Sequence, residues 1–387
     1  MNNENIHSVL HDALAFAEKE NYKGYDPYDT LNTTLPIGIF GKWGKVLAIQ
    51  FQKRFPWNIR PLLGIKKERN PKAIGLFLQT YCNLYNLEKK EEYLHKANEL
   101  FEWLISNYTK GYSGYCWGYN FEWASPVKTL PKFSPTIVVT GFIAQGIFKY
   151  YQISKNPKAL EVLESIVLFI EKDLPQTQDQ SGICISYSTI AKDVCYNASM
   201  LAAEHCARLF SITKKDNYRE KALAITRFTV TRQKNDGSWL YSMNLDDFSE
   251  RKQIDFHQGY VLDSIKEVIK FCEAKEFLPA YEKGLAFYQE HQFLPNGQAL
   301  YRLPKKYPIE IHNQSQGIIT FSRALELGFD YTEIARTILH FTLNNLYNSR
   351  RHTFYYKKYP FYTIKTPFMR WNQAWMVLAM SEFNSIK

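Results

Sequence analysis

Apolar residues recur along the chain in six long segments, each of which begins with a short cluster of polar residues. The segments start at Asn70, Ser134, Cys195, Phe256, His312 and Arg370, so successive starts lie 64, 61, 61, 56 and 58 residues apart. An apolar pattern of this length indicates a buried helix. Six such helices at nearly even spacing indicate an internal repeat.

More amphipathic segments lie between these helices, with apolar residues every three or four positions and charged residues between them. Clear examples begin at Lys158, Arg219 and Asp330. The repeat unit is therefore a helical hairpin whose first helix is the more buried one. Six hairpins can close into a ring, so we expect an all-α fold, an (α/α)6 toroid formed by residues 1–387 as a single domain. An open solenoid of stacked hairpins is the alternative.

Short aromatic-rich runs follow most of the second helices, and most of these runs begin with Gly. They span residues 114–123, 182–188, 237–242, 297–303 and 353–364. Their composition predicts short strands or β-hairpin-like loops. Since each run precedes an inner helix, these loops and the inner-helix N-termini should meet at one end of the ring. Helix N-termini carry unpaired N–H groups and partial positive charge, so we expect a central cleft there that binds a polar or anionic ligand.

The composition adds two hints about the ligand. Aromatic residues make up 16% of the chain, and aromatic side chains both fill cores and line sugar-binding clefts. The net charge of +10 favours an acidic partner. Lysine and arginine are spread along the chain rather than gathered in one block. An acidic glycan is therefore expected as the partner, and no nucleic acid.

The N-terminal segment and the cysteines bear on location. Residues 1–20 contain acidic residues and no apolar core of the kind found in signal peptides. No run of about 18 apolar residues occurs, so no membrane span is expected. The six cysteines are scattered without paired spacing, which is typical of reduced thiols. These features predict a cytoplasmic protein.

Polar residues at the inner-helix starts provide the candidates for catalysis. His257 and Tyr260 open the fourth inner helix just after Asp255, and His312 opens the fifth. Histidine and tyrosine can move protons during catalysis. Asp26, in a Pro-containing loop near the N-terminus, could supply a carboxylate. For a lone histidine such as His257, capping or core packing is the more frequent explanation.

Other residues at the same end are candidates for binding. Arg370 could clamp a carboxylate through two hydrogen bonds. The other expected polar contacts are Asn197, Asn313, Gln316 and Asn372, and the expected walls of the cleft are Trp117, Tyr119, Glu122, Trp239 and Tyr241. Some of these aromatic residues are expected to serve packing instead.

Three stretches resemble known families. "YKGYDPYDTLN" (22–32) and "RPLLGIKKERNPKAIGLFL" (60–78) resemble a bacterial family encoded with surface-polysaccharide biosynthesis genes. The helical repeat resembles the six-hairpin glycosidase superfamily, and "SPTIVVTGFIAQGIFKYYQISKNPKALE" (134–161) is similar to the toroidal domain of glucuronyl C5-epimerases. These resemblances imply an oligo- or polysaccharide ligand and other polysaccharide-biosynthesis proteins as partners. They transfer no catalytic residue.

Three kinds of glycan function remain open. A glycoside hydrolase needs two carboxylates beside the sugar bond, and no pair stands out among Asp26, Asp29, Glu122, Asp236 and Asp255. A uronate lyase or epimerase needs a group that moves a proton and a group that neutralises the carboxylate. The inventory of His, Tyr, Asn and Arg fits that chemistry somewhat better. A non-catalytic glycan-binding assembly protein would need only the cleft.

A rival comes from a different class of toroid. "QKNDGSW" (233–239) resembles the repeat of terpene cyclases, and zinc-dependent prenyltransferases hold their metal with Asp, Cys and a distant His. Asp193 and Cys195, with His257 one repeat later, have suitable ligand types. The cyclase motif DxDD is missing from the sequence. The preferred glycan interpretation therefore expects no metal and no cofactor.

Overall fold

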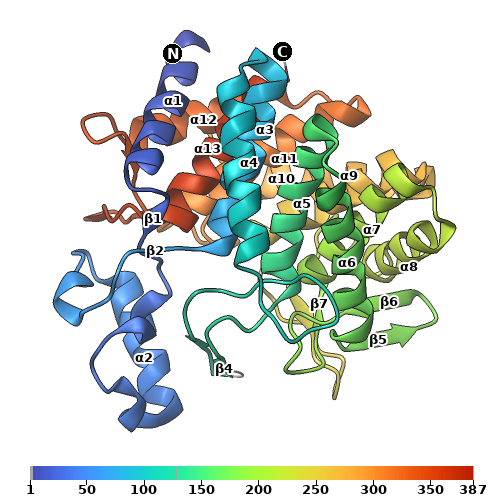
Figure 1. The fold of residues 1–387 in the computed structure, drawn as a ribbon, viewed down its shortest axis with the longest axis horizontal. Coiled ribbons are helices and arrows are strands. Elements are labelled where there is room, and N and C mark those ends of the chain that lie inside the picture. Colours follow the sequence, from blue (N-terminus) through green and yellow to red (C-terminus); the bar gives the residue numbers. More distant parts are fainter. Residues whose placement is uncertain (1–2, 127–128, 387) are drawn as a thin grey trace.

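The computed structural model describes residues 3–126 and 129–386. Six helices begin within a few residues of the positions that the repeat predicts, and they form an inner ring (Figure 1). They are α3 (Pro71–Glu88), α5 (Ile137–Ser154), α7 (Tyr196–Thr213), α9 (His257–Cys272), α11 (Ile311–Ala324) and α13 (Trp375–Asn384), the last extended at its start by a π-helix (Met369–Ala374).

The ring closes. Each inner helix packs against the next one in the chain, and α13 packs back against α3. Asn83 near the end of α3 donates hydrogen bonds to Ser381 Oγ at 2.9 Å and to Glu382 Oε1 at 3.1 Å on α13. The predicted (α/α)6 toroid is therefore confirmed, and the open solenoid is wrong.

Outer helices complete the six hairpins. Five of them follow their inner helices directly: α4 (Glu91–Ser106), α6 (Pro157–Lys172), α8 (Asp216–Val230), α10 (Leu278–Gln292) and α12 (Thr332–Leu346). The sixth outer position belongs to α1 (Asn3–Lys19), which packs against α13. The first helix of the chain thus completes the last hairpin, a pairing that the spacing of the repeat does not reveal.

The turns from inner to outer helices share one geometry. Four inner helices end in a residue with positive φ, between 53° and 58°, followed by a single residue before the next helical segment; these residues are Lys89, Lys155, Lys214 and Glu273. A left-handed residue reverses the chain after a helix C-terminus. None of the four left-handed residues is the usual glycine or asparagine; three are lysines, whose positive charge suits the negative end of a helix.

Small residues let the inner helices approach closely. A Cβ atom on Gly146 of α5 would lie 2.7 Å from the carbonyl oxygen of Gly75 on α3. At Gly259 of α9, a Cβ atom would lie 2.6 Å from the side chain of Gln316 on α11. Glycine lets α5 pack against the backbone of α3 at the first position, and lets α9 pack against a side chain of α11 at the second.

Short antiparallel strands lie in four of the five predicted aromatic runs and in the segments beside them, whereas the run 297–303 forms isolated bridges only. They pair as β1 (Lys23–Gly24) with β2 (Glu68–Arg69), β3 (Trp123–Ala124) with β4 (Thr129–Leu130), β5 (Gln176–Asp179) with β6 (Gly182–Ile185), β7 (Val194–Cys195) with β8 (Ser242–Met243), and β10 (Tyr347–Asn348) with β11 (Thr353–Phe354). A three-stranded sheet has the order β13 (Thr363–Ile364), β12 (Lys357–Lys358) and β9 (Ile309–Glu310).

Between α1 and α3 the chain leaves the ring. It forms the 3₁₀ helices η1 (Asp29–Asn32), η2 (Ile37–Phe40) and η3 (Pro61–Leu63) and the helix α2 (Gly41–Arg54). Figure 1 shows α2 at the lower left, below the ring. Val46 and Ile49 of α2 form a small core with Ala124. Trp43, Leu47 and Phe51 of the same helix are exposed.

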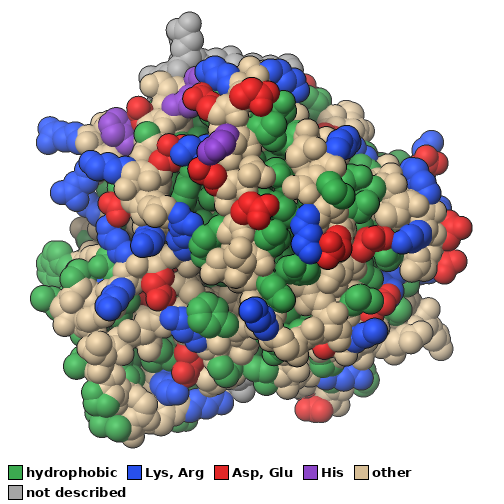
Figure 2. All heavy atoms as spheres, in the orientation of Figure 1, with side chains coloured by type: hydrophobic (Ala, Val, Ile, Leu, Met, Phe, Trp, Pro, Cys, Tyr) green, Lys and Arg blue, Asp and Glu red, His purple; other side chains and the backbone are tan. Residues whose placement is uncertain are grey.

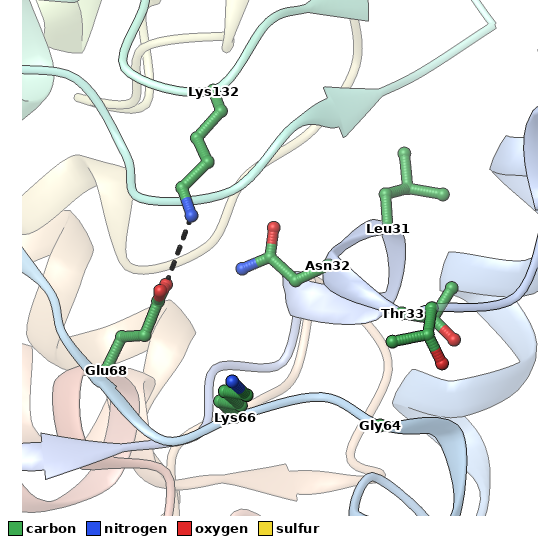
Figure 3. Close-up of a pocket in the computed structure, with 8 residues that line it drawn as sticks. Leu31, Asn32, Thr33, Gly64, Lys66, Glu68 and Lys132 are labelled. Carbon is green, nitrogen blue, oxygen red and sulfur yellow. Dashed lines mark hydrogen bonds and ion pairs between the residues drawn. The ribbon is translucent and has the colours of Figure 1, made fainter.

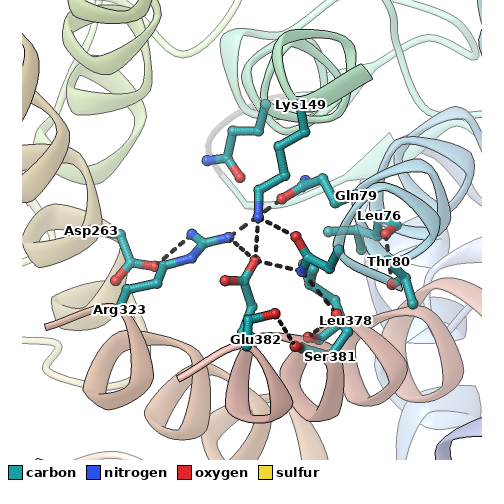
Figure 4. A network of polar contacts seen from close by, with 12 residues as sticks. Leu76, Gln79, Thr80, Lys149, Asp263, Arg323, Leu378, Ser381 and Glu382 are labelled. Carbon is teal, nitrogen blue, oxygen red and sulfur yellow. Dashed lines mark hydrogen bonds and ion pairs between the residues drawn. The ribbon is translucent and has the colours of Figure 1, made fainter. Parts of the chain in front are cut away.

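A buried network of charged side chains crosses the ring axis toward the C-terminal ends of the inner helices (Figure 4). Arg323 of α11 contacts Glu382 of α13 at 2.8 Å and Asp263 of α9 at 3.2 Å. Lys149 of α5 contacts the same Glu382 oxygen at 2.8 Å. The network therefore joins four inner helices by ion pairs, and the axis is filled at this level rather than open.

Two further sequence expectations concern cysteines and membranes. All six cysteines are free thiols, and all six are buried. Among the described residues, no helix is long and apolar enough to cross a membrane.

Candidate functional site

The predicted catalytic residues converge at the N-terminal end of the inner ring. We call this group the central cluster: Asp26, Lys72, Asp255, His257, Tyr260, His312 and Arg370. Aromatic rings connect its members, since Phe256 stacks on both His257 and His312 with ring centroids 4.1 Å apart in each case. The repeat therefore brings chemically capable side chains from separate helices into one place.

Asp255 and His257 form a hydrogen-bonded dyad. His257 Nδ1 lies 2.5 Å from Asp255 Oδ1, and Gln253 donates to the other carboxylate oxygen at 2.7 Å. Burial alone would raise the pKa of Asp255, but the charge and hydrogen bonds of His257 outweigh burial and lower it. A carboxylate in this position fixes the orientation of the imidazole and leaves Nε2 available to exchange a proton.

The outward side of His257 is accessible to solvent. The side chain of His257 is 19% exposed, whereas that of Asp255 is 3% exposed. Within the described part of the chain, no hydrogen bond to Nε2 is found, and the ring lies edge-on to Tyr241 with centroids 4.9 Å apart. A partly exposed histidine held by a buried aspartate is a suitable acid/base group.

His312 and Tyr260 form a second, fully buried pair. The Tyr260 hydroxyl lies 2.6 Å from His312 Nε2, and His312 Nδ1 has no partner among the described residues. Burial, followed by the charges of Lys72 and Arg370, holds the pKa of His312 well below its usual range. The imidazole is therefore neutral at ordinary pH. Through the hydrogen bond to Nε2, His312 can hold the Tyr260 hydroxyl in a fixed orientation.

Arg370 is already paired within the protein. Its guanidinium contacts both oxygens of Asp26, at 2.6 and 2.8 Å, and is 2% exposed. Asp26 in turn caps its own loop by accepting the Tyr28 N–H at 3.0 Å. Arg370 thus clamps a carboxylate, as its chemistry predicts, but this carboxylate belongs to the N-terminal loop rather than to a ligand.

Lys72 is a member of the cluster that the sequence analysis missed. It lies in the first turn of α3, and its ammonium sits over the ring of Phe142 at 4.0 Å and near Trp375 at 5.2 Å. No ion-pair partner of Lys72 is found in the described part of the chain. Burial, followed by the charge of Arg370, holds the pKa of this lysine well below its usual range. Its position at the start of an inner helix is the signal that could have identified it.

Tyrosines surround the cluster and keep partial exposure. Tyr119 packs against Arg370, whose guanidinium carbon lies 4.9 Å from its ring, and Tyr28 lies beside Trp371 with centroids 5.5 Å apart. Tyr241 lies beside His257, as described above. Tyr119 and Tyr241 therefore lie beside the central cluster, where the sequence predicts them, and so does Tyr28; their role as walls of a ligand cleft stays a prediction.

Two predicted wall residues lie in the core instead. Trp117 and Trp239 are fully buried, and their indole N–H groups donate to the backbone of outer helices, at Leu104 and Thr229, over 3.0 Å. These tryptophans lie within the aromatic runs at positions that face the hydrophobic core, where a large ring stabilises the hairpin. The correction follows from side-chain direction, which the composition of a loop does not specify.

The predicted polar contacts serve the scaffold. Asn313 accepts from the backbone N–H of Phe256 at 3.1 Å, and Asn372 donates to the carbonyls of Phe354 and Thr366, both at 2.9 Å. Deeper in the ring, Gln316 donates to Asp263 at 3.0 Å. These amides satisfy buried backbone and side-chain groups, which is their usual role in a buried position.

The last two predicted contacts are also engaged. Asn197 accepts a hydrogen bond from the Cys195 thiol at 3.2 Å in a buried position. Glu122 pairs with Lys45 at 2.7 Å and thereby links the β3 loop to α2. In the described part of the chain, neither residue has a hydrogen bond or ion pair with a member of the central cluster.

The proposed zinc ligands do not meet. Among the described residues, the one group of at least three side chains whose His, Cys, Asp or Glu ligand atoms converge is His7, His11 and Glu88, on the outside of the ring. Asp193 instead accepts the backbone N–H of Tyr187 at 2.7 Å, in a turn before α7. The geometry expected of a zinc-dependent prenyltransferase, with Asp193, Cys195 and His257 around one ion, is therefore wrong for this chain.

Cations outnumber carboxylates around the cluster. Arg302 lies 3.7 Å from Asp255, Arg251 lies over Tyr241, and Lys357 lies 3.4 Å from the buried Glu310. With Arg370, these make four cationic side chains near three carboxylates, those of Asp26, Asp255 and Glu310, while burial holds the pKa of Lys53 and of Lys72 well below its usual range. The excess of positive charge favours an anionic ligand.

Two hollows on the surface lie outside the central cluster. One of about 290 Å³ is bordered by polar side chains including Asn32, Lys66, Glu68 and Lys132 (Figure 3). Figure 3 shows Lys132 and Glu68 pointing toward each other, and their charged groups are 3.3 Å apart. The other, of about 330 Å³, lies between α1 and α12. Neither hollow contains a predicted site residue.

Comparisons with known proteins place the fold. No family model and no curated protein sequence matches the chain. Among solved structures, a sugar epimerase from a ruminal bacterium superimposes with a TM-score of 0.70 at 14% identity, covering 99% of this chain and 98% of that one. The GH76 α-mannanase BT2949 of Bacteroides thetaiotaomicron has a TM-score of 0.65 at 15% identity, covering 98% and 95%.

A third similar structure is an unsaturated glucuronyl hydrolase specific for heparin, with a TM-score of 0.65 at 12% identity, covering 98% of this chain and 96% of that one. These proteins are carbohydrate-active enzymes of the (α/α)6 toroid class. At such low identity the likeness establishes the six-hairpin toroid fold of this chain, as the repeat predicts.

Proposed function

We propose that the protein is a carbohydrate-active enzyme that moves a proton on an acidic sugar, in the manner of a uronate epimerase or lyase. The observation that carries the proposal is the Asp255–His257 dyad, which presents an oriented imidazole Nε2 to solvent at the N-terminal end of the ring. A proton transfer next to a carboxylate needs such a group and nearby positive charge. The surrounding cations supply that charge.

Lys72 has properties that suit a second proton-transfer group. Epimerisation removes a proton on one face of a carbon and returns one on the other face, so two groups are needed. Burial holds the pKa of Lys72 well below its usual range, so this lysine gives up its proton more readily than an exposed lysine and is better suited to proton transfer. Tyr260, held by His312, lies between the two groups: its ring centroid is 5.5 Å from that of His257 and 5.7 Å from the Lys72 ammonium.

A glycoside hydrolase is supported less well. Each buried carboxylate near the cluster is already tied to a partner: Asp26 to Arg370, Asp255 to His257, and Glu310 to the Trp371 N–H at 3.0 Å. A similar α-1,6-mannanase of the GH76 class is inactive when two consecutive aspartates are replaced. The sole consecutive pair in this chain, Asp246 and Asp247, lies exposed on the loop after β8.

The resemblance to a family encoded with surface-polysaccharide biosynthesis genes supports a place in the formation or modification of such a polysaccharide. In that role the substrate is an acidic oligo- or polysaccharide, and other biosynthesis proteins are partners. A glycan-binding protein without catalysis is the second candidate. Pairing of every cluster carboxylate is the observation that favours it, because binding needs no free acid.

Incubation with polyuronides in deuterated water tests the proposal. Deuterium uptake at the sugar C5, or absorbance from an unsaturated uronate, is expected from the wild-type chain. His257→Ala should reduce the rate by roughly 10²- to 10⁴-fold, the usual contribution of a general acid or base. His291→Ala, an exposed histidine on α10, is the matched control and should keep full activity. Glycan binding without uptake or absorbance across a panel of acidic glycans would identify the binding protein instead.

A further inference from the structure

The segment between η1 and β2 has a surface unlike the rest of the molecule. Eight large apolar side chains in the 28 residues from Leu35 to Leu62 are more than half exposed. They are Leu35, Ile39, Phe40, Trp43, Leu47, Phe51, Trp57 and Leu62. We call these residues the apolar ridge. Ten other exposed large apolar residues are found over the whole remainder of the described chain, so the ridge is a local concentration.

Helix α2 explains the ridge. Trp43, Leu47 and Phe51 recur every four residues and form one stripe along the helix, next to Phe40. Val46 and Ile49 form a second stripe, which packs against Ala124 of the ring. A surface helix normally has one apolar face and one polar face. Helix α2 has two apolar faces, and the ring covers one of them.

The charge of the segment is equally one-sided. Residues 30–67 contain seven basic residues and no acidic residue: Lys42, Lys45, Lys53, Arg54, Arg60, Lys66 and Lys67. Four of these, Lys42, Arg54, Lys66 and Lys67, are exposed. Figure 2 shows hydrophobic and basic side chains together at the lower left, where Figure 1 places α2.

The β12–β13 turn extends the same surface. Tyr362 donates to the carbonyl of Arg54 at the end of α2, over 3.5 Å, and its neighbour Phe361 is 98% exposed. Lys365 follows in the same segment and is also exposed. Aromatic and basic residues from two distant parts of the sequence therefore lie together.

We infer that the apolar ridge and the exposed basic residues beside it dock the protein on the surface of an anionic lipid bilayer. Tryptophan and phenylalanine are suited to the headgroup boundary, and lysine and arginine are attracted to anionic lipids. Residues 30–67 contain no acidic side chain that would repel such a surface. Glu20 and Glu122 of neighbouring segments pair with Lys67 and Lys45, whereas Arg54 and Lys66 are exposed and have no carboxylate contact in the described part of the chain. A partner that offers negative charge alone would leave the apolar ridge exposed to water.

The opposite face of α2 reaches the central cluster. Lys53 lies over the ring of Tyr28 at 3.8 Å, and Gln52 accepts a hydrogen bond from Thr30 of the loop that contains Asp26. Docking through the exposed face therefore leaves the contacts with the cluster in place. It would hold the N-terminal end of the ring close to the bilayer.

Co-sedimentation of the full chain with phosphatidylcholine vesicles, with and without phosphatidylglycerol, tests this inference. Binding is expected with the anionic vesicles, with weakening as salt rises. Lys42→Glu with Arg54→Glu should weaken binding by more than tenfold, since each basic residue contributes roughly fivefold and reversal acts twice. Lys110→Glu with Lys172→Glu, two exposed basic residues elsewhere, is the matched control.

An apolar variant separates the bilayer from a second copy of the chain. Trp43→Ser, Leu47→Ser and Phe51→Ser together should abolish vesicle binding, whereas Leu168→Ser, Ile190→Ser and Leu325→Ser should leave it unchanged. Sedimentation velocity measures the oligomeric state of the same proteins. A dimer that the first variant dissociates, with no vesicle binding by the wild type, would assign the ridge to self-association and overturn the inference.

A separate cluster on the outside of the ring has the geometry of a metal site. His7 and His11 lie one turn apart on α1, and Glu88 is the last residue of α3. The two Nε2 atoms are 3.1 Å apart, and they lie 3.0 and 3.4 Å from Glu88 Oε1. Tetrahedral zinc with bonds of about 2.0–2.1 Å places its ligand atoms roughly 3.3 Å from one another.

The surroundings of Glu88 leave one oxygen for a metal ion. Lys90 and Tyr93 contact Oε2, at 2.8 and 3.2 Å, while Oε1 faces the two histidines. His7 Nε2, His11 Nε2 and Glu88 Oε1 can each offer a lone pair to a cation, and the three atoms face one another. The geometry assigns a divalent zinc-type site to His7, His11 and Glu88, with water as a fourth ligand.

Calorimetric titration of the full chain with zinc tests the second inference. One equivalent should bind, and the Tm should rise with zinc concentration because the ion binds the folded state. His7→Ala and His11→Ala should each remove both effects. His95→Ala on α4, a well-exposed histidine, is the control. Absence of saturable binding, or equal binding by the two variants and the wild type, would overturn the assignment.

Discussion

Two buried polar clusters lie within the same ring and differ in how their charges are satisfied. The network around Arg323 and Glu382 pairs each charge with an opposite one and joins four helices (Figure 4). The central cluster has pairs as well, but it also has Lys72 over aromatic rings, His312 with an unpartnered Nδ1, and His257 with a solvent-facing Nε2. Complete pairing is what stability needs, whereas unused hydrogen-bonding capacity is typical of functional sites.

The largest effect is expected from breaking the fully paired network. Glu382→Gln leaves Arg323 and Lys149 without their shared carboxylate, so the free energy of unfolding should fall by about 3–5 kcal/mol. Chemical denaturation followed by circular dichroism measures the change. Glu333→Gln, at an 87% exposed side chain on α12, should cost less than about 0.5 kcal/mol. A loss as small as the control would show that the network contributes little.

Asp26 and Arg370 belong to the central cluster, but they form a complete buried ion pair, as the charges of the Arg323–Glu382 network do. Asp26→Asn should lower the free energy of unfolding by about 2–4 kcal/mol, because it leaves a buried guanidinium with a neutral partner. The double variant Asp26→Leu/Arg370→Met should recover most of that loss. If the recovered variant also loses affinity for acidic glycans, Arg370 contacts ligand carboxylates after all. Unchanged affinity would limit the pair to structure.

Asp255 should matter for rate more than for stability. Asp255→Asn keeps the size of the side chain and removes the charge that orients His257. We expect the rate on the active polyuronide to fall by about 100-fold, equivalent to ~2.7 kcal/mol, with the larger part in kcat. The free energy of unfolding, measured in parallel, should change by less than that. A large loss of free energy of unfolding with little loss of rate would show that Asp255 and His257 stabilise the fold rather than take part in catalysis.

Lys72 should show the smallest effect and a distinctive pH dependence. Its pKa is lowered in the folded state, so the unfolded state binds more protons between that pKa and the ordinary value near 10.4. The folded state is therefore stabilised as pH rises through this window. Lys72→Met should raise the free energy of unfolding by about 1 kcal/mol at pH 7, and the difference from wild type should shrink as pH approaches 10. A difference that does not vary with pH would mean that the lysine stays charged in both states.

The sequence alone was sufficient for the repeat of six helical hairpins. The starts of the six inner helices follow from the repeat to within a few residues, because each needs a continuous apolar surface. Two of them also have a side-chain cap: Asn70 accepts from the backbone N–H of Lys72 at 3.0 Å, and Thr136 accepts from that of Val139 at 3.1 Å. Ring closure is different. It depends on Asn83 meeting Glu382 almost three hundred residues later, and a pattern within one helix carries no information about such a distant contact.

For the candidate site, the sequence predicted the location but not the roles. Asp255, His257, Tyr260 and His312 do converge, because equivalent positions of a closed repeat lie at the same height. Trp117, Trp239, Asn313 and Asn372 occupy similar positions in the repeat and turn toward the core or the backbone. Lys72 reads as an ordinary basic residue in sequence, and burial beneath aromatic rings is what makes it unusual.

The sequence by itself determined the helices, the period and the basic, aromatic character of the chain, because these depend on residue type and local spacing. The tertiary structure decided which polar groups are paired. Whether Arg370 clamps a ligand or Asp26, and whether the second apolar stripe of α2 is covered, depend on side-chain directions and on contacts between segments far apart in the chain. Those contacts form when the whole ring has closed.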